Sequence, residues 1–321
     1  MSFGKKSSVM IVHGQDTEYS GGEVVVIGAS HLDNIIKFNE KITFGRTNSA
    51  QSNVTLGGVA ANIVRAFRRE AFEAVSFVTA ISMYESGLQA VKPISDTKSS
   101  AIRVNAPPPI YTAILDASGE LIIGAADMQL YEKVSSEDVM AKLPNRLKTL
   151  VMDGNFPEKT LQEVAFSLPS ECLLFVAGTS IGKVPRFANF LERIDAFSCN
   201  RAEAIKLTEC VLGSSNSEQL EVSELAQKLS TRLRDKGCAL VSDGHRKAAF
   251  ACDQILIERE PPSINLCNAN GAGDVMAASF FGQLSIANDW SQFSVSDFNQ
   301  LLKNALTAGA KHAAQEEVRS D

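Results

Sequence analysis

A glycine-rich turn, Gly271-Ala272-Gly273, is followed directly by Asp274 and then by an apolar stretch typical of a helix. Backbone N–H groups at the start of a helix can bind an anion such as a phosphate. A carboxylate beside that anion is useful as the base that takes a proton from a hydroxyl attacking the phosphate. The alternative is that Asp274 only caps the helix, and the other motifs must decide between the two.

Two common nucleotide-binding motifs do not fit this chain. A dinucleotide fingerprint needs a third glycine and follows the first strand, whereas the first expected strand ends in IGASHLD at residues 27–33. A P-loop ends in Gly-Lys-Ser or Gly-Lys-Thr, which the turn lacks. The sequence therefore argues against a nicotinamide-dependent dehydrogenase and a P-loop enzyme.

Three further motifs accompany the turn: GASHLD, GGVAAN and NRAEA. Together with GAGD, in this order, they resemble the ribokinase-like (PfkB-type) carbohydrate and nucleoside kinases over most of the chain, from Val24 to Ala313. The resemblance implies an enzyme that uses ATP and Mg²⁺ to phosphorylate a hydroxymethyl group of a sugar or nucleoside. It also implies that Asp274 is the catalytic base and that the amides of Gly271, Ala272 and Gly273 form an anion hole.

The same resemblance assigns further residues by motif. The substrate side would be formed by Asp33, Gly57, Gly58 and Asn62, and the nucleotide side by Asn200, Gly244 and Asn304. Glu203, three residues after Asn200 on a helix start, would bind Mg²⁺ through water. Ordinary helix capping and solvated acids remain the alternative explanation for Asp33, Asn200 and Glu203.

Within this family the chain resembles the pseudouridine kinases in particular. The likeness is carried by TNSAQSNVTLGGVAAN, YTAILDASGELIIGAADM, VMDGN and CNRAEA. It places Asp127, Asp153 and Asn155 near the substrate and Lys183 near the nucleotide. Turn formation and solvent exposure explain these four side chains equally well.

Several positions depart from the family pattern. Asn268 and Ala269 stand where the family has Asp and Thr, which leaves the need for a monovalent cation open. Ala61 and His31 replace an arginine and an asparagine of many relatives, which leaves the acceptor open between pseudouridine, another nucleoside and a free sugar. A retired scaffold, meaning a protein that keeps the kinase fold and binds such a ligand but does not turn over ATP, is the alternative from another class of protein.

The elements expected to position these residues alternate between strands and helices. Short β-branched runs that end in glycine or in Asp/Asn, as at 23–30 and 147–155, indicate buried parallel strands. We therefore expect an α/β fold, a ribokinase-like doubly wound and mostly parallel sheet with helices on both faces. Ligands bind at the carboxyl ends of the strands in such sheets.

Segments 35–56 and 100–128 break this alternation, and the turn at Asp116–Gly119 has a strong hairpin signal. We expect them to form a small β-sheet lid inserted in a kinase domain of residues 23–321, after a flexible extension of residues 1–22. An apolar lid face would favour a homodimer. We expect Arg65, Arg68 and Arg69 to form a solvated helix face.

The 321 residues carry a net charge of −6 at pH 7, which provides no basic surface for nucleic acid. No apolar run reaches the length of a membrane span, and the start of the chain lacks a signal-peptide pattern. The six cysteines show no metal-binding spacing and are expected to be reduced thiols. These properties favour a cytoplasmic protein.

Overall fold

The computed structural model describes residues 23–70, 75–84, 99–213, 217–267 and 269–314. They include a nine-stranded sheet in the order β13-β12-β11-β10-β9-β8-β1-β4-β5. The strands are parallel from β5 to β11, and β12 and β13 are antiparallel. Their bounds are β1 Glu23–Ile27, β4 Val75–Ser82, β5 Ser99–Val104, β8 Leu147–Asp153, β9 Leu173–Ala177, β10 Ala196–Asn200, β11 Cys238–Ser242, β12 Ala248–Cys252 and β13 Ile255–Arg259.

The strand order changes direction at β1, which lies between β4 and β8. The chain runs outward to β4 and β5 on one side and to β8, β9, β10 and β11 on the other. The loops that follow β1 and β8 therefore diverge and leave a crevice at the carboxyl edge of the sheet, which is where ligands bind in doubly wound folds.

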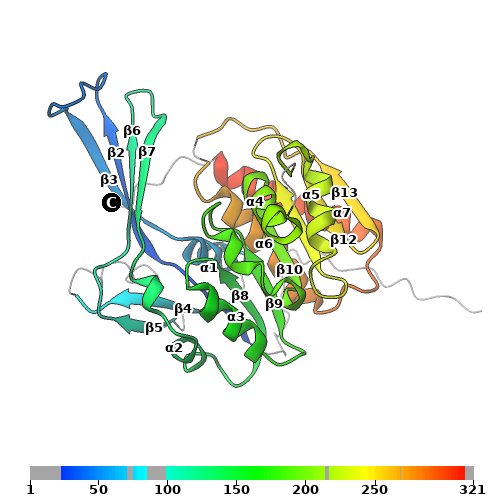
Figure 1. Ribbon diagram of the computed structural model, residues 1–321. Coiled ribbons are helices and arrows are strands. Elements are labelled where there is room, and N and C mark those ends of the chain that lie inside the picture. The colour runs from blue at the N-terminus through cyan, green and yellow to red at the C-terminus, as the bar shows by residue number, and fades with distance from the viewer. Residues whose placement is uncertain (1–22, 71–74, 85–98, 214–216, 268, 315–321) are drawn as a thin grey trace, which may run out of the picture.

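Helices cover both faces of this sheet (Figure 1). One face packs against α1 (Val59–Arg69), α6 (Ala272–Ala287) and α7 (Val295–Ala313), and the other against α2 (Ser136–Met140), α3 (Glu158–Ser167), α4 (Arg201–Leu212) and α5 (Val222–Ser230). Successive strand side chains alternate between the two cores, with Val25 and Ile27 in one and Val24 and Val26 in the other. The expected α/β fold with two helical layers is confirmed.

Two segments in the helical layers are shorter or tighter than regular α-helices. Residues 184–194 form two 3₁₀ turns, Val184–Phe187 and Leu191–Arg193, instead of one α-helix. Phe187 and Phe190 are both buried and lie three residues apart, a spacing that matches the three-residue turn of a 3₁₀-helix. The other short 3₁₀ turns are Tyr131–Lys133 and Ser217–Gln219, and α5 ends at Ser230.

A second sheet of four strands has the order β3-β2-β6-β7. It is built from β2 (His31–Phe38), β3 (Ala50–Gly57), β6 (Ile110–Leu115) and β7 (Leu121–Asp127), and it projects from the larger body in Figure 1. The hairpin predicted at Asp116–Gly119 joins β6 to β7. The expected segment 100–128 is divided, however, because β5 pairs with β4 in the large sheet and only the part from Ile110 joins the small one.

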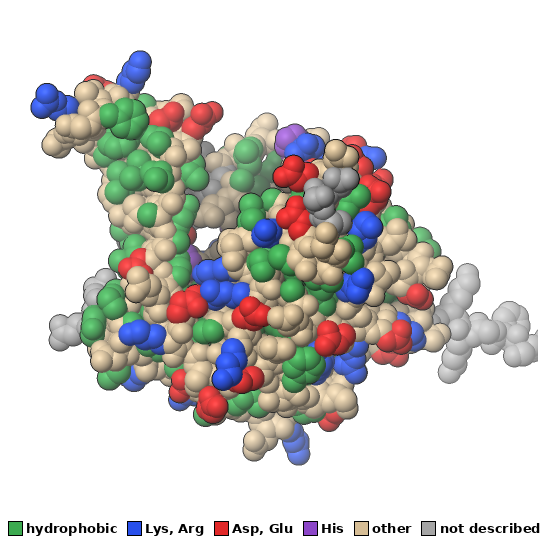
Figure 2. All heavy atoms as spheres, viewed as in Figure 1, with side chains coloured by type: hydrophobic (Ala, Val, Ile, Leu, Met, Phe, Trp, Pro, Cys, Tyr) green, Lys and Arg blue, Asp and Glu red, His purple; other side chains and the backbone are tan. Residues whose placement is uncertain are grey.

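Hydrophobic side chains gather on the small sheet in the view of Figure 2. Val54, Leu121 and Ile123 are 57%, 58% and 58% exposed, unlike the strands of the large sheet, which are mostly buried. Elsewhere, all six cysteines are unpaired thiols, as expected. Among the residues that the structure describes, no helix has the length and apolarity needed to cross a membrane.

Candidate active site

Asp153, the last residue of β8, holds together the segments around the crevice. Its fully buried carboxylate accepts hydrogen bonds from the N–H groups of Ala29 (3.0 Å), Ala60 (3.1 Å) and Asn155 (2.9 Å). Gly28 has a φ of 143°, and a Cβ there would overlap this carboxylate. Asp153 was expected near the substrate, but its oxygens are occupied by backbone donors of the β1 loop and the α1 start. Its direct contact with the substrate stays a prediction.

Asp274 lies in the first turn of α6, not at its N-cap. The N-cap is Gly271, whose φ of 76° is left-handed and which offers no side chain for capping. The Asp274 carboxylate instead accepts a hydrogen bond of 2.6 Å from Asn62 Nδ2 of α1. Simple helix capping, the alternative for this aspartate, is therefore not what the structure shows.

The electrostatic surroundings favour a proton acceptor at Asp274. Burial, together with the negative charges of Asp153 and Glu203, raises the pKa of its carboxyl to about 7. The hydrogen bond from Asn62 and the charge of Arg65 act in the opposite direction. A carboxyl with a pKa close to neutral can both accept and release a proton near physiological pH, as a general base must.

The glycine turn itself is open on the Gly273 side. Gly273 is exposed, and a Cβ there would meet nothing within 4 Å, so a ligand can approach its backbone closely. The Ala272 N–H instead donates to the Ala269 carbonyl oxygen at 3.2 Å. Of the three amides expected to form the anion hole, the Ala272 N–H is thus already bonded within the loop.

His312 near the end of α7 fastens this loop and was not anticipated from the sequence. Its Nε2 lies 2.9 Å from the carbonyl oxygen of Asn270. The Cys267 N–H donates to the Ala313 carbonyl oxygen at 2.9 Å, so two contacts join the loop to the same helix end. A Cβ on Gly271 would lie 3.4 Å from His312 Nε2, which shows how closely the imidazole approaches the turn.

On the substrate side, Asp33 of β2 is buried, with Oδ1 2.9 Å from His31 Nδ1. Gly57 lies on the neighbouring strand β3, and a Cβ there would overlap the Asp33 carboxylate. Gly58 has a φ of 106°, and a Cβ there would overlap the Ala29 carbonyl oxygen. Both glycines are therefore required by close approach of neighbouring groups, and their expected contact with the substrate stays a prediction.

Arg65 is turned into the site and does not belong to a solvated face. Its Nη2 donates to the Leu56 carbonyl oxygen at 2.9 Å and to Asn62 Oδ1. The expectation of three solvated arginines is therefore wrong for Arg65, whereas Arg69 is exposed as expected. Arg65 lies one helical turn after Asn62 and therefore faces the same way, which the motif itself did not indicate.

The two residues assigned through VMDGN and TSIGK contact each other. Lys183 Nζ donates to Asn155 Oδ1, and the Asn155 side chain is buried. Burial lowers the pKa of Lys183, while the charge of Asp153 opposes that shift. Asp127, at the end of β7, is exposed and accepts a 3.4 Å hydrogen bond from the Gln129 N–H. Its carboxylate does not join this cluster.

Asn200 and Glu203 form a reciprocal capping box at the start of α4. The Asn200 N–H donates to Glu203 Oε2, and the Glu203 N–H donates to Asn200 Oδ1, both at 3.0 Å. Burial raises the pKa of Glu203. Gly178 leaves room for this carboxylate, since a Cβ there would overlap Glu203 Oε2.

The described residues fit a Mg²⁺ ion that arrives with ATP better than an ion held by protein alone. No group of three or more His, Cys, Asp or Glu in this part of the chain could hold a metal. Mg²⁺ in phosphotransferases keeps several waters and is held by substrate phosphates with one or two carboxylates. Glu203 is a buried carboxylate whose negative charge raises the pKa of Asp274.

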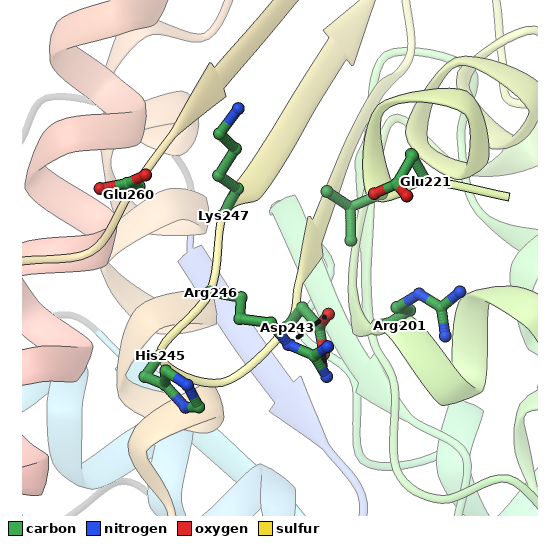
Figure 3. A pocket seen from close by; sticks show the side chains of 8 residues that line it. Arg201, Glu221, Asp243, His245, Arg246, Lys247 and Glu260 are labelled. Atoms are coloured by element: carbon green, nitrogen blue, oxygen red, sulfur yellow. Dashed lines mark hydrogen bonds and ion pairs between the residues drawn. The ribbon is translucent and has the colours of Figure 1, made fainter.

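A cavity of about 670 Å³ lies beside the loop that follows β11. Figure 3 shows Asp243, His245, Arg246 and Lys247 from this loop together with Arg201 of α4. The loop contains Gly244, whose φ is 60°. Arg246 Nε lies 3.1 Å from Asp243 Oδ2, and the remaining lining residues are Glu221, Val222 and Glu260.

Asn304, the other residue assigned to the nucleotide side, lies away from the lining of this cavity. Its Nδ2 donates to Gln283 Oε1 at 2.8 Å, and its Oδ1 accepts from Gln300 Nε2 at 2.7 Å. These bonds place Asn304 in an amide network that joins α6 to α7. Gly244 thus lies between two residues that line the cavity, Asp243 and His245, whereas the Asn304 side chain is engaged between helices.

The sheet is doubly wound, and the Asp274 carboxylate lies in the first turn of a helix beside an open glycine turn, an arrangement that suits an ATP-dependent phosphotransferase. Residues 22–315 match the model of the pfkB family of carbohydrate kinases, and the chain belongs to that family. Its substrates are accordingly ATP and a small sugar-like molecule.

Two relatives have names that refer to pseudouridine. The chain is 23% identical over 275 residues to the pseudouridine kinase of Escherichia coli, covering 79% of this chain and 81% of that protein. It is 26% identical over 196 residues to a pseudouridine-metabolizing bifunctional protein of Schizosaccharomyces pombe. That match covers 59% of this chain and only 26% of the yeast protein.

The fold is similar to that of ribokinase from Thermotoga maritima. The two structures superpose with a TM-score of 0.74 at 17% sequence identity, and the match covers 92% of this chain and 93% of the ribokinase. At this identity the likeness extends to the fold alone. It confirms the expected ribokinase-like architecture.

Proposed function

We propose that this protein transfers the γ-phosphoryl group of ATP to the 5′-hydroxymethyl group of pseudouridine. The observation that carries the phosphoryl transfer is the half-buried Asp274 carboxylate, which accepts a hydrogen bond from Asn62 and has a pKa raised to about 7 beside an open glycine turn. The choice of pseudouridine is supported by the name of the E. coli relative, whose length the chain mostly covers.

In the proposed reaction each carboxylate has a separate task. Asp33 accepts hydrogen bonds from ring hydroxyls of the acceptor and orients it, and this positioning provides a large part of the rate. Asp274 takes the proton from the attacking hydroxymethyl group. The Gly271 and Gly273 amides at the start of α6 stabilise the charge on the transferred phosphoryl group, with the Ala272 amide joining them if its bond to Ala269 opens.

ATP is proposed to bind on the Gly244 side, where the β11 loop and Arg201 line the cavity. Cationic side chains there, including Arg246 and Lys247, complement the charge of the triphosphate. Mg²⁺ neutralises the phosphates when bound, and Asn200 and Glu203 would hold its water ligands. Asn304 contributes indirectly, through the network that joins α6 to α7.

The small sheet is proposed to close over the acceptor as a lid. Asp33 and Gly57 belong to its strands β2 and β3, so the sheet that covers the site also carries the acceptor-binding carboxylate. Excluding water is necessary because an open site would transfer the phosphoryl group to water. The apolar residues exposed on this sheet support a homodimer formed through the lid.

The experiment is a coupled ADP-release assay with ATP, Mg²⁺ and pseudouridine, uridine, adenosine, ribose or fructose 6-phosphate in turn. We expect pseudouridine to give the highest kcat/KM, and ³¹P NMR of the product to show a 5′-phosphate. A second nucleoside or sugar as acceptor is the other candidate, because His31 rather than asparagine contacts Asp33. Activity with that acceptor and none with pseudouridine would refute pseudouridine as the acceptor and leave the kinase assignment intact. Binding without ADP release for every compound would indicate a retired scaffold.

A further inference from the structure

Arg65, Asn62 and Asp274 form a continuous chain of hydrogen bonds. Arg65 Nη2 donates to Asn62 Oδ1, and Asn62 Nδ2 donates to Asp274 Oδ2 at 2.6 Å. The same Arg65 nitrogen donates to the Leu56 carbonyl oxygen at 2.9 Å. The chain therefore connects β3 of the small sheet with α1 and with the first turn of α6.

The chemistry of the three groups permits one direction for this chain. A guanidinium only donates hydrogen bonds, whereas an asparagine amide has an accepting oxygen and a donating nitrogen. Because Arg65 can only donate, Asn62 Oδ1 must face it, and Nδ2 is then directed at Asp274. A reversed amide would place its oxygen against the carboxylate and its NH₂ group against the guanidinium. Arg65 therefore determines which end of Asn62 the carboxylate meets.

Arg65 also interacts electrostatically with both carboxylates of the site. Burial lowers the pKa of its guanidinium, while the charges of Asp274 and Asp33 both raise it. Asp33 belongs to the small sheet and Asp274 to the body, so the proposed closing of the lid would bring two negative charges together. A cation near both offsets that repulsion. Arg69, which is exposed on the same helix, carries a like charge that lowers the pKa of Arg65.

We propose that Arg65 is a positioning residue of this kinase, which directs the Asn62 amide onto Asp274 and so keeps the base ionised and aimed at the acceptor. This inference rests on the proposed function, because it assigns a role toward the same base. The charged groups facing Asp274 come from three elements: Asp153 from β8, Glu203 from α4 and Arg65 from α1. Arg65 is the member of this set that opposes protonation.

The test compares the titration of Asp274 in the wild type with that in Arg65→Met, Arg65→Gln and Arg65→Lys. Carboxyl ¹³C NMR of Asp-labelled protein follows the titration, and Asp274→Asn identifies the signal. We expect the pKa of Asp274 to rise in Arg65→Met and Arg65→Gln by about one unit, equivalent to a tenfold change in the proton affinity. Arg65→Lys keeps the positive charge but loses the forked N–H donors of the guanidinium, so a smaller rise in the pKa of Asp274 is expected. Arg69→Met is the matched control and should leave the titration unchanged.

Kinetics provide the second readout. In Arg65→Met the acid limb of the kcat profile should move to higher pH by the same amount as the NMR titration, with an unchanged KM for ATP. An unchanged Asp274 titration in either neutral variant that folds would overturn the proposal and leave Arg65 with a packing role. If the titration moves while the wild type phosphorylates no acceptor, the link between Arg65 and Asp274 is supported and the proposed function fails.

Discussion

Asn62 Nδ2 and Asp274 Oδ2 are 2.6 Å apart although 212 residues separate them in the chain. Asn62 belongs to the glycine motif expected to bind the substrate, and Asp274 to the turn expected to bind the phosphoryl group. Their hydrogen bond directly links the motif proposed to bind the acceptor to the turn proposed to bind the phosphoryl group. The motifs of this chain therefore act as a single site, in which a change at one should be measurable at the other.

Asp274→Asn should abolish turnover, with kcat falling by at least about 10²-fold, since general base catalysis contributes about 10² to 10⁴. ATP binding should persist, because the amide has the size of the carboxyl and the glycine turn is unchanged. Isothermal titration with a non-hydrolysable ATP analogue, alongside the coupled assay, checks both points. A variant that retained most of its activity would refute the assignment of the base.

The same substitution should change the pH dependence of stability. Asp274 has a folded pKa of about 7, above its ordinary value, so the folded state binds the proton more tightly than the unfolded state. Its contribution to stability is fully present below pH 4 and is lost as the pH rises through 7. Thermal denaturation should therefore show that Asp274→Asn gains stability relative to the wild type at pH 8, and less at pH 5. An equal difference at both pH values would contradict the raised pKa.

Asp153→Ala should destabilise the protein by on the order of 3 kcal/mol, because it leaves several buried N–H groups without an acceptor. Urea denaturation measures this loss. Asp33→Asn is the informative comparison, since it should raise the KM for the acceptor with a much smaller effect on stability. If Asp153→Ala instead altered only the acceptor KM, Asp153 would belong to the substrate site.

His312→Ala should lower kcat, because it releases the Asn270 carbonyl and with it the loop that precedes the anion hole. His312→Gln should recover part of the activity, since its side-chain amide can donate a hydrogen bond to the same carbonyl oxygen. Steady-state kinetics of both variants, with circular dichroism to confirm folding, test this role. Equal losses in the two variants would count against the hydrogen bond as the reason.

Leu121→Asp should convert the proposed dimer to a monomer, because it places a charge on the apolar face of the lid. Val295→Asp is the matched control, since Val295 is 59% exposed on α7, compared with 58% for Leu121 on β7. Sedimentation velocity of the two variants and the wild type provides the measurement. A wild type that is monomeric at micromolar concentration would remove the dimer from the proposal.

Much of the site could be predicted from the sequence because its motifs are local. A glycine turn that feeds a helix, paired glycines before Asn62 and the Asn200–Glu203 spacing each specify backbone geometry within a few residues. The strands of the large sheet other than β5 were equally predictable, because burial on both faces requires continuous apolar runs. The hairpin at Asp116–Gly119 likewise follows from turn residues between alternating strands.

Only the tertiary structure decided the roles of side chains whose partners lie far away in the chain. The pattern of α1 places Arg65 on a polar face, but its partners Leu56 and Asp274 come from other elements. Asp153 belongs to a segment typical of a ligand-binding loop, yet the amides of Ala29 and Ala60 fold over it. Sequence determined which chemistry was available, because residue types and local turns carry it. Packing determined which groups face the ligand, because burial and long-range hydrogen bonds exist only in the folded chain.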